Sequence, residues 1–145
     1  MLYADASAIG RAFFADEQGH EELRALLLGS GEPVVTSELA KVELAAAVRR
    51  AGRAARFADW SALLAAVEAT CALGGAITLL ELRPRPTLDT ARELVLEHRV
   101  RALDAIHLAV AIEDARPLAA PDELRFVTRD RDQAEAAAAL GLTLG

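Results

Sequence analysis

The sequence predicts an α/β protein of three layers, with a central parallel sheet of four to five strands flanked by helices. Short apolar segments with the pattern of strands alternate with longer segments of helical periodicity, which is typical of a parallel sheet covered on both faces. The chain has 145 residues, of which 53% are hydrophobic, so it is long and apolar enough to bury one sizeable core. We therefore predict a single domain over residues 1–145.

The first elements are predicted from apolar runs and the breaks between them. An apolar strand over residues 2–4 leads into a helix over 7–16, where small and apolar residues recur with helical spacing. A short helix over 21–28 ends in a glycine-rich break, and a brief strand over 33–35 follows. A hydroxyl residue is then placed to cap the next helix.

The middle of the chain predicts two helices and a strand. A helix over residues 38–51 is expected to end at Gly52, and the next helix, over 53–72, has an apolar stripe. Two glycines separate it from a strand over 76–82. The connector over 83–86 contains two prolines and is expected to be stiff.

The last third of the chain repeats the alternation of helices and strands. Its elements are two helices, a strand, a further helix and a final edge strand, over residues 87–98, 102–112, 124–128, 133–140 and 142–144. Two prolines predict a loop over residues 115–123.

The composition excludes several classes of protein. No apolar segment is long and uncharged enough to span a bilayer, and Asp5 interrupts the start that a signal peptide needs, so we expect a cytoplasmic protein without a membrane partner. Cys71 is the only cysteine, which excludes an intrachain disulfide, and we interpret it as a small buried hydrophobe. The net charge of −6 is not typical of a nucleic-acid binder.

Three carboxylates stand at element boundaries. Asp5 follows the first strand, Asp130 follows the strand over 124–128, and Asp104 begins an almost uniformly apolar helix. Each could be a helix cap or be stabilised by the helix dipole. Asp5 and Asp130 are nevertheless expected at the same edge of the sheet, where ligands bind in parallel α/β folds.

Glu43 is unusual because it projects onto the apolar side of its helix, opposite the predicted solvent face with Glu38 and Lys41. A buried carboxylate is costly unless a cation or hydrogen bonds compensate it, so Glu43 belongs either to a buried salt bridge or to a functional site. His107 lies one turn after Asp104 and faces the same way. We interpret it as a core histidine in preference to a metal ligand.

Four carboxylates brought together repel one another unless divalent cations neutralise them, and all-oxygen ligation suits Mg²⁺ or Mn²⁺. Such a site can activate water and stabilise charge on a phosphoryl group. Arginines between residues 49 and 56 form either a solvated corner or a phosphate contact. The sequence contains no Ser-His-Asp order, histidine-rich ligand set or nucleotide-binding fingerprint that would point to another chemistry.

Four segments of the chain resemble the PIN-domain nucleases, and most closely the VapC-type toxins of toxin–antitoxin pairs. They are residues 3–8 (YADASA) with Arg11 beyond, 36–44 (TSELAKVEL), 101–109 (RALDAIHLA) and 126–132 (FVTRDRD). The segments occur in the family's order and cover essentially the full length. The resemblance implies a PIN-like α/β/α fold.

The resemblance also implies a role for each matching residue. Asp5, Glu43, Asp104 and Asp130 match the family's acidic residues that hold Mg²⁺ or Mn²⁺. Ser7, Thr128, Asp132 and Arg11 are expected around them, beside the ligands or toward the substrate. Asp132 could add a carboxylate directly or through water, and ranks below the four acids.

The activity implied by the resemblance is that of a metal-dependent endoribonuclease toxin, often directed at structured RNAs such as tRNA. A cognate VapB-type antitoxin is expected to dock near the helices around residues 38–70, and homodimers are usual in the family. Two alternatives are a PIN nuclease of RNA processing or repair and a non-catalytic PIN scaffold. A phospho-receiver module would need a lysine at a late strand end, but Lys41, the only lysine, is predicted on a solvent-exposed helix face.

Overall fold

The central sheet has five strands, all of them parallel, in a computed structural model that describes residues 1–145. The strands are β1 (Leu2–Ala4), β2 (Val34–Ser37), β3 (Ile77–Leu80), β4 (Arg125–Val127) and β5 (Thr143–Leu144). Their spatial order is β3-β2-β1-β4-β5, with β1 at the centre. In the register, Leu2 is opposite Val34 on one side and Arg125 on the other. The predicted parallel sheet is confirmed.

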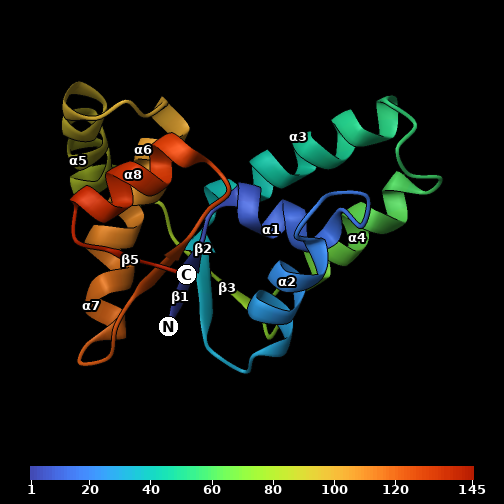
Figure 1. The fold of residues 1–145 in the computed structure, drawn as a ribbon, viewed down its shortest axis with the longest axis horizontal. Coiled ribbons are helices and arrows are strands. Elements are labelled where there is room, and N and C mark those ends of the chain that lie inside the picture. The colour runs from blue at the N-terminus through green and yellow to red at the C-terminus, as the bar shows by residue number, and fades with distance from the viewer.

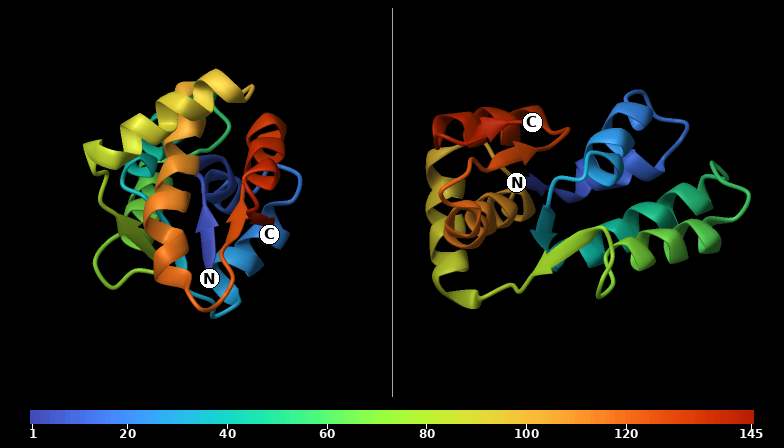
Figure 2. Two further views of the ribbon diagram at one scale, coloured as in Figure 1. Left: turned by 90° about the vertical axis from the view of Figure 1, so that its left-hand side faces the viewer. Right: turned by 90° about the horizontal axis from the view of Figure 1, so that it is seen from below.

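Helices cover both faces of this sheet, and each half of the chain supplies one layer (Figures 1 and 2). The first layer contains α1 (Ala6–Phe13), α2 (His20–Arg24) with a π-helical turn (Ala25–Gly29), α3 (Leu39–Arg53) and α4 (Trp60–Thr70). The second contains α5 (Pro84–Glu97), α6 (Ala102–Val110) with a π-helical turn (Ala111–Ala115), α7 (Arg116–Ala119) and α8 (Arg131–Ala139). The predicted three-layer architecture is confirmed. None of the helices is long and apolar enough to cross a membrane.

Alternating residues of the strands face the two layers, as strand geometry requires. Leu2 and Ala4 belong to a core cluster with side chains of α1–α4, whereas Tyr3 between them belongs to a second cluster with α5–α8. In β4, Val127 faces the first cluster and Phe126 faces the second, where its ring stacks on Tyr3 at a centroid distance of 5.3 Å. The two clusters hold the sheet between the layers.

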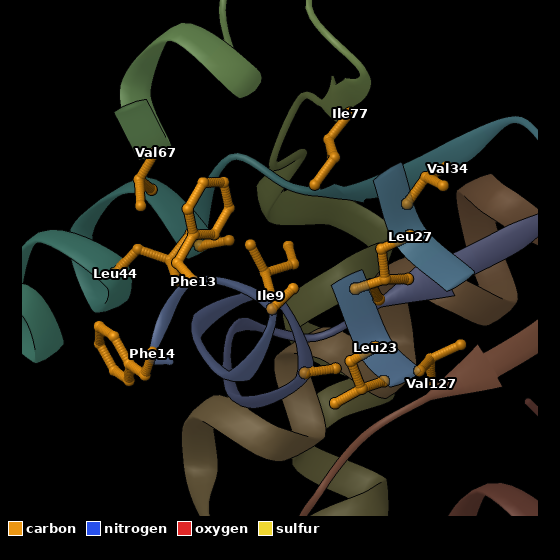
Figure 3. Close-up of a cluster of buried hydrophobic side chains, with 14 of the residues drawn as sticks. Ile9, Phe13, Phe14, Leu23, Leu27, Val34, Leu44, Val67, Ile77 and Val127 are labelled. Atoms are coloured by element: carbon orange, nitrogen blue, oxygen red, sulfur yellow. The ribbon is translucent and has the colours of Figure 1, made fainter. Parts of the chain in front are cut away.

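The first cluster is built from large side chains, with Ile9 and Phe13 of α1 packed among Leu44 of α3, Val67 of α4 and Ile77 of β3 (Figure 3). Burying a side chain of this size contributes roughly 1.5–3 kcal/mol. In the second cluster, alanines of α6 and α8 take much of the space. Both layers are therefore fixed against the sheet, and the helix ends at its carboxyl edge are fixed with them.

The boundary between α3 and α4 differs from the prediction. α3 continues through Gly52 to Arg53, and α4 begins at Trp60 after Asp59, whose carboxylate accepts a hydrogen bond from the Ala62 N–H at 2.9 Å. A Cβ atom on Gly52 would lie only 2.6 Å from Cγ of Trp60. The interpretation of Gly52 as a helix stop was wrong, because this glycine is needed for the close approach of Trp60 to α3.

Of two proline-containing segments, one is more helical than predicted and the other agrees with the prediction. Residues 115–123 are not simply a loop, since the π-helical turn Ala111–Ala115 and α7 occupy their first part, and Pro117 lies in the first turn of α7, where a missing N–H costs little. The predicted connector over 83–86 has extended backbone at Arg83 and at Arg85 (φ −127°, ψ 132°), and the regular turns of α5 follow Arg85, so the prediction of a connector ahead of the helix is confirmed.

Candidate active site

A pocket of about 610 Å³ opens at the carboxyl edge of the sheet. It lies beside β1, where the spatial order of strands changes direction and where ligands bind in open parallel sheets. The four predicted carboxylates line it together with four arginines: Asp5, Glu43, Asp104 and Asp130, and Arg11, Arg50, Arg101 and Arg129. The structure therefore brings the four acids to one place.

Asp5 is the most enclosed of the acids, with 3% of its surface exposed. It directly follows β1 and caps α1, so one oxygen (Oδ1) accepts from the Ala8 N–H at 2.9 Å and from the Ser7 hydroxyl at 2.8 Å. Its other oxygen (Oδ2) accepts from the Thr128 hydroxyl at 3.0 Å. Burial raises the pKa of Asp5, and these hydrogen bonds oppose the rise. Capping and lining the pocket are thus compatible for this residue.

Gln133 was not predicted to belong to the site, yet it connects two of its elements. Its side chain is fully buried, and its Nε2 donates to the Asp104 carbonyl oxygen at 3.2 Å. Its backbone N–H donates to Asp130 Oδ1 at 3.0 Å, which makes Asp130 the cap of α8. Its side-chain oxygen also contacts the Thr128 hydroxyl. The only sequence feature that could have indicated this role is the position of Gln133 at the start of an otherwise alanine-rich helix.

Glu43 is held by a buried histidine. The Glu43 Oε2 atom lies 2.7 Å from Nε2 of His107, and Nδ1 of His107 lies 2.9 Å from the Tyr3 hydroxyl. Burial raises the pKa of Tyr3, so the phenol keeps its proton and can donate it to Nδ1. A neutral imidazole that accepts at Nδ1 carries its hydrogen on Nε2 and donates it to Glu43.

These contacts show how the charge of Glu43 is compensated and what role His107 has in the fold. The compensating partner of Glu43 is His107, whose Nε2 lies 2.7 Å from Glu43 Oε2. His107 itself is a core residue, with 1% of its surface exposed, and both of its ring nitrogens have partners. The interpretation of His107 as a core histidine is confirmed.

Arg101 joins the two carboxylates of the second layer. Its Nε lies 2.8 Å from Asp104 Oδ2, and its Nη2 lies 2.9 Å from Asp130 Oδ2. Asp104 is buried, whereas 77% of the Arg101 side chain is exposed. The hydrogen bond to Asp104 and the charges of both acids raise the pKa of Arg101, so the guanidinium is charged throughout the physiological range.

The chemistry of the donor set fits a divalent cation, since four carboxylates with hard oxygen donors line one pocket. In this conformation, however, no three histidine, cysteine or carboxylate side chains are arranged to share one metal ion. The Arg101 guanidinium lies between Asp104 and Asp130 and pairs with both, so it would compete with a cation for these two carboxylates. The residues present therefore fit a divalent cation. In this conformation the positive charge beside Asp104 and Asp130 comes from Arg101.

The remaining predicted residues divide between the pocket and its surroundings. Ser7 lines the pocket, and its hydroxyl also accepts from the Arg129 N–H at 2.9 Å. Arg11 lies at the rim, where its Nε is 2.6 Å from Glu17 Oε2. Asp132 does not line the pocket, and its nearest ionic partner is the exposed Arg131 at 3.8 Å. Asp132 therefore lies outside the lining of the pocket, although its charge still acts on Arg101 and helps to raise the pKa of that residue.

The arginines between residues 49 and 56 do not form one patch. Arg50 lines the pocket, whereas Arg49 lies over the Trp60 ring at 4.8 Å. Arg56 binds Asp16 and Glu17 through its Nε and Nη2 atoms. The solvated-corner interpretation therefore describes most of this cluster, and Arg50 is the member placed to meet a ligand in the pocket.

Comparisons with known proteins agree with this geometry. The family model of the PIN domain matches residues 2–139. The chain therefore belongs to the PIN domain family, and it is a VapC-type PIN nuclease. It is 33% identical over 133 residues to Ribonuclease VapC47 of Mycobacterium tuberculosis (strain CDC 1551 / Oshkosh). The aligned residues cover 90% of this chain and 85% of the relative.

A solved structure supports the fold. The crystal structure of Mycobacterium tuberculosis VapC20, described as a Sarcin-Ricin loop cleaving toxin, superposes with a TM-score of 0.71 at 15% sequence identity. The match covers 94% of this chain and 95% of that one. At this identity the comparison concerns the fold alone, and it confirms the predicted PIN-like α/β/α architecture.

Proposed function

We propose that this protein is a metal-dependent endoribonuclease and the toxin of a VapBC-type toxin–antitoxin pair. The observation that carries the proposal is the convergence of Asp5, Glu43, Asp104 and Asp130 on one pocket at the carboxyl edge of the sheet. The 33% identity to a ribonuclease of the family supports RNA as the substrate. A cytoplasmic location, where RNA substrates are found, is part of the same proposal.

In this proposal the four carboxylates hold Mg²⁺ or Mn²⁺ in the pocket. The bound cation activates water and neutralises charge on the phosphodiester. The chain's part is orientation, because Ser7, Thr128 and the Ala8 N–H fix the Asp5 carboxylate, and His107 fixes Glu43.

RNA binding by an acidic protein requires local positive charge near the reacting phosphate. Arg50 and Arg129 line the pocket, are exposed, and make no ion pair with a carboxylate of the chain. We assign them to the phosphates that flank the cleaved bond. The protein's net charge of −6 then does not oppose binding, because physiological salt largely screens charges that lie more than about 8–10 Å from the phosphates.

An apolar groove of about 300 Å³ between α3 and α4 supports the proposed docking of a VapB-type antitoxin around residues 38–70. Its floor includes Leu44, Leu64 and Val67, with Lys41 and Glu68 also lining it. Cys71 also lines this groove and is only half-buried, so the prediction of a buried cysteine was wrong. A basic antitoxin side chain reaching the acids would complete the inhibition.

Exposed apolar side chains on the second layer support the proposed homodimer. Leu88, Val95 and Leu96 of α5 are 46%, 41% and 70% exposed, and Leu103 of α6 is 45% exposed. Apolar residues gathered on neighbouring helices are typical of protein interfaces. α5 and α6 pack against each other, so these residues can belong to one face.

The test is RNA cleavage with Mg²⁺ by purified Asp5→Asn and Asp104→Asn variants. Each is expected to lose at least about 100-fold in rate, because a ligand oxygen of the cation is replaced by a weaker donor. Asp132→Asn is the matched control, since it makes the same change outside the pocket and should cleave within about twofold of the unchanged protein. EDTA should abolish cleavage by all of them.

Undiminished cleavage by Asp104→Asn would exclude the proposed site. Absence of cleavage by the unchanged protein, together with absence of Mn²⁺ binding in calorimetry, would favour the non-catalytic scaffold. Sequencing the RNA ends produced when the protein is induced would identify the substrate, and would decide between tRNA and other structured RNAs. Rescue of induced cells by the neighbouring reading frame would test the antitoxin pairing.

A further inference from the structure

We propose that Arg101 exchanges partners during the reaction, binding Asp104 and Asp130 while the pocket holds no metal and an RNA phosphate once metal has displaced it. Arg101 would then be both an internal competitor of the cation and a substrate-positioning residue. This inference rests on the proposed metal-dependent ribonuclease function. Arg101 is not one of the predicted carboxylate ligands, and it lies three positions before one of them, Asp104.

The first step follows from geometry. Asp104 comes from the first turn of α6 and Asp130 caps α8, and the Arg101 guanidinium bridges their Oδ2 atoms at 2.8 and 2.9 Å. A single positive charge therefore compensates two carboxylates. A divalent cation held by Asp104 and Asp130 would compete with Arg101 for the same carboxylates, so metal binding would displace the Arg101 bridge.

The second step follows from exposure. The Arg101 side chain is 77% exposed, so its ion pairs are screened by water and cost little to break. The Asp104 side chain is only 13% exposed, so this carboxylate stays in place when the arginine leaves. The mobile partner is therefore Arg101, and the fixed partners are the acids.

Once released from the two acids, the Arg101 guanidinium stays close to the pocket. Arg101 lines the same pocket as Arg50 and Arg129, and its backbone is fixed at the N-terminus of α6. The side chain therefore remains beside the acids that it leaves. A planar guanidinium forms paired hydrogen bonds with a phosphate as readily as with a carboxylate. The phosphate brought to the metal is the nearest anion that can replace the lost partners.

Two substitutions with the same change of charge separate this proposal from a general field effect. Arg101→Gln removes the bridge, whereas Arg129→Gln removes a charge from the same pocket without breaking any ion pair. Calorimetry with Mn²⁺ should give Arg101→Gln a dissociation constant about five- to tenfold lower than that of the unchanged protein. Arg129→Gln should change it by less than about twofold.

Kinetics at saturating Mn²⁺ test the second partner. Both substitutions are expected to raise KM for RNA by roughly tenfold, because each removes a phosphate contact. Only Arg101→Gln should combine tighter metal binding with weaker RNA binding. Arg101→Lys, which keeps the charge without the planar fork, should recover part of the RNA affinity. Circular dichroism of the metal-free variants checks that each is folded.

A direct view of the exchange comes from the Arg101 Nε–Hε signal in ¹⁵N spectra, identified by its absence in Arg101→Gln. Adding Mg²⁺ should shift this signal, and the other arginine signals should move less. Unchanged Mn²⁺ affinity in Arg101→Gln would overturn the proposal, and so would tighter Mn²⁺ binding with an unaltered KM. Absence of Mn²⁺ binding in every protein would instead overturn the proposed function, and this inference with it.

Discussion

The two sides of the acidic pocket hold their carboxylates in different ways. On the side of the first helical layer, Asp5 is 3% exposed and accepts hydrogen bonds from three neutral donors. On the side of the second layer, Asp104 and Asp130 share one exposed arginine. Neutral donors can stay in place when a cation arrives, whereas a positively charged partner has to leave.

Glu43 stands between these cases. It belongs to the first layer, but its partner His107 comes from α6 of the second, 64 positions away. The histidine is buried and is fixed in turn by Tyr3, so this contact belongs with the permanent ones. The comparison indicates a site with two preset carboxylates, Asp5 and Glu43, and two that rearrange their partners. Four predictions test this difference, in order of decreasing effect.

The largest effect on folding is expected from Asp5→Ala. This substitution removes the cap of α1 and leaves the buried Ala8 N–H without a partner, so it should lower the free energy of unfolding by about 2 kcal/mol. Asp130→Ala removes a more exposed cap and should cost about 1 kcal/mol. Urea denaturation in EDTA measures both. Equal losses would contradict the distinction between the two sides.

A smaller loss is expected from Tyr3→Phe. The change removes the hydroxyl that binds His107 Nδ1 and keeps the ring that stacks on Phe126, so it should cost about 1–1.5 kcal/mol. Loss of this support should also lower kcat several-fold, because Glu43 is then less well oriented. Thermal unfolding and cleavage assays check the two effects. Unchanged kcat would show that Tyr3 does not position Glu43.

A pH dependence is expected from the raised pKa of Asp5. Burial makes the folded protein bind the Asp5 proton more tightly than the unfolded chain does, so ionised Asp5 lowers stability. This penalty is absent below the ordinary value of 3.8 and grows as pH rises through the folded pKa. In EDTA, the stability of Asp5→Asn relative to the unchanged protein should therefore increase as pH rises above 3.8. A constant difference over that range would contradict the prediction.

The smallest effect is expected from Ser7→Ala. Ser7 supplies one of the three donors to Asp5 and is itself exposed, so water can replace its hydroxyl. The cost should be about 0.5–1 kcal/mol, with Mn²⁺ affinity reduced by less than about threefold. Denaturation and calorimetry on the same preparation measure these values. A loss as large as that of Asp5→Ala would mean that Ser7, and not the carboxylate, organises this corner.

Local sequence patterns were sufficient for much of the fold. The strands β1 and β2 were predicted from short apolar runs, because a strand buried on both faces needs apolar residues at successive positions, whereas the edge strand β5 is exposed. The boundaries were less well predicted at Gly52 and Pro117. Gly52 lies inside a helix because Trp60 packs closely against it, and Pro117 is tolerated because it lies in the first turn of α7. A glycine packed against a tryptophan has the same local sequence signal as a glycine that ends a helix.

The sequence by itself determined which carboxylates are available, since Asp5 and Asp130 follow strands and Asp104 opens a helix. Only the tertiary structure decided what holds them. Arg101 reaches Asp130 across 29 positions of sequence, and His107 reaches Glu43 across 64. Element boundaries are set by local backbone preferences, whereas hydrogen-bond partners depend on how packed layers orient side chains at the shared edge of the sheet. Composition and spacing carry no record of that orientation.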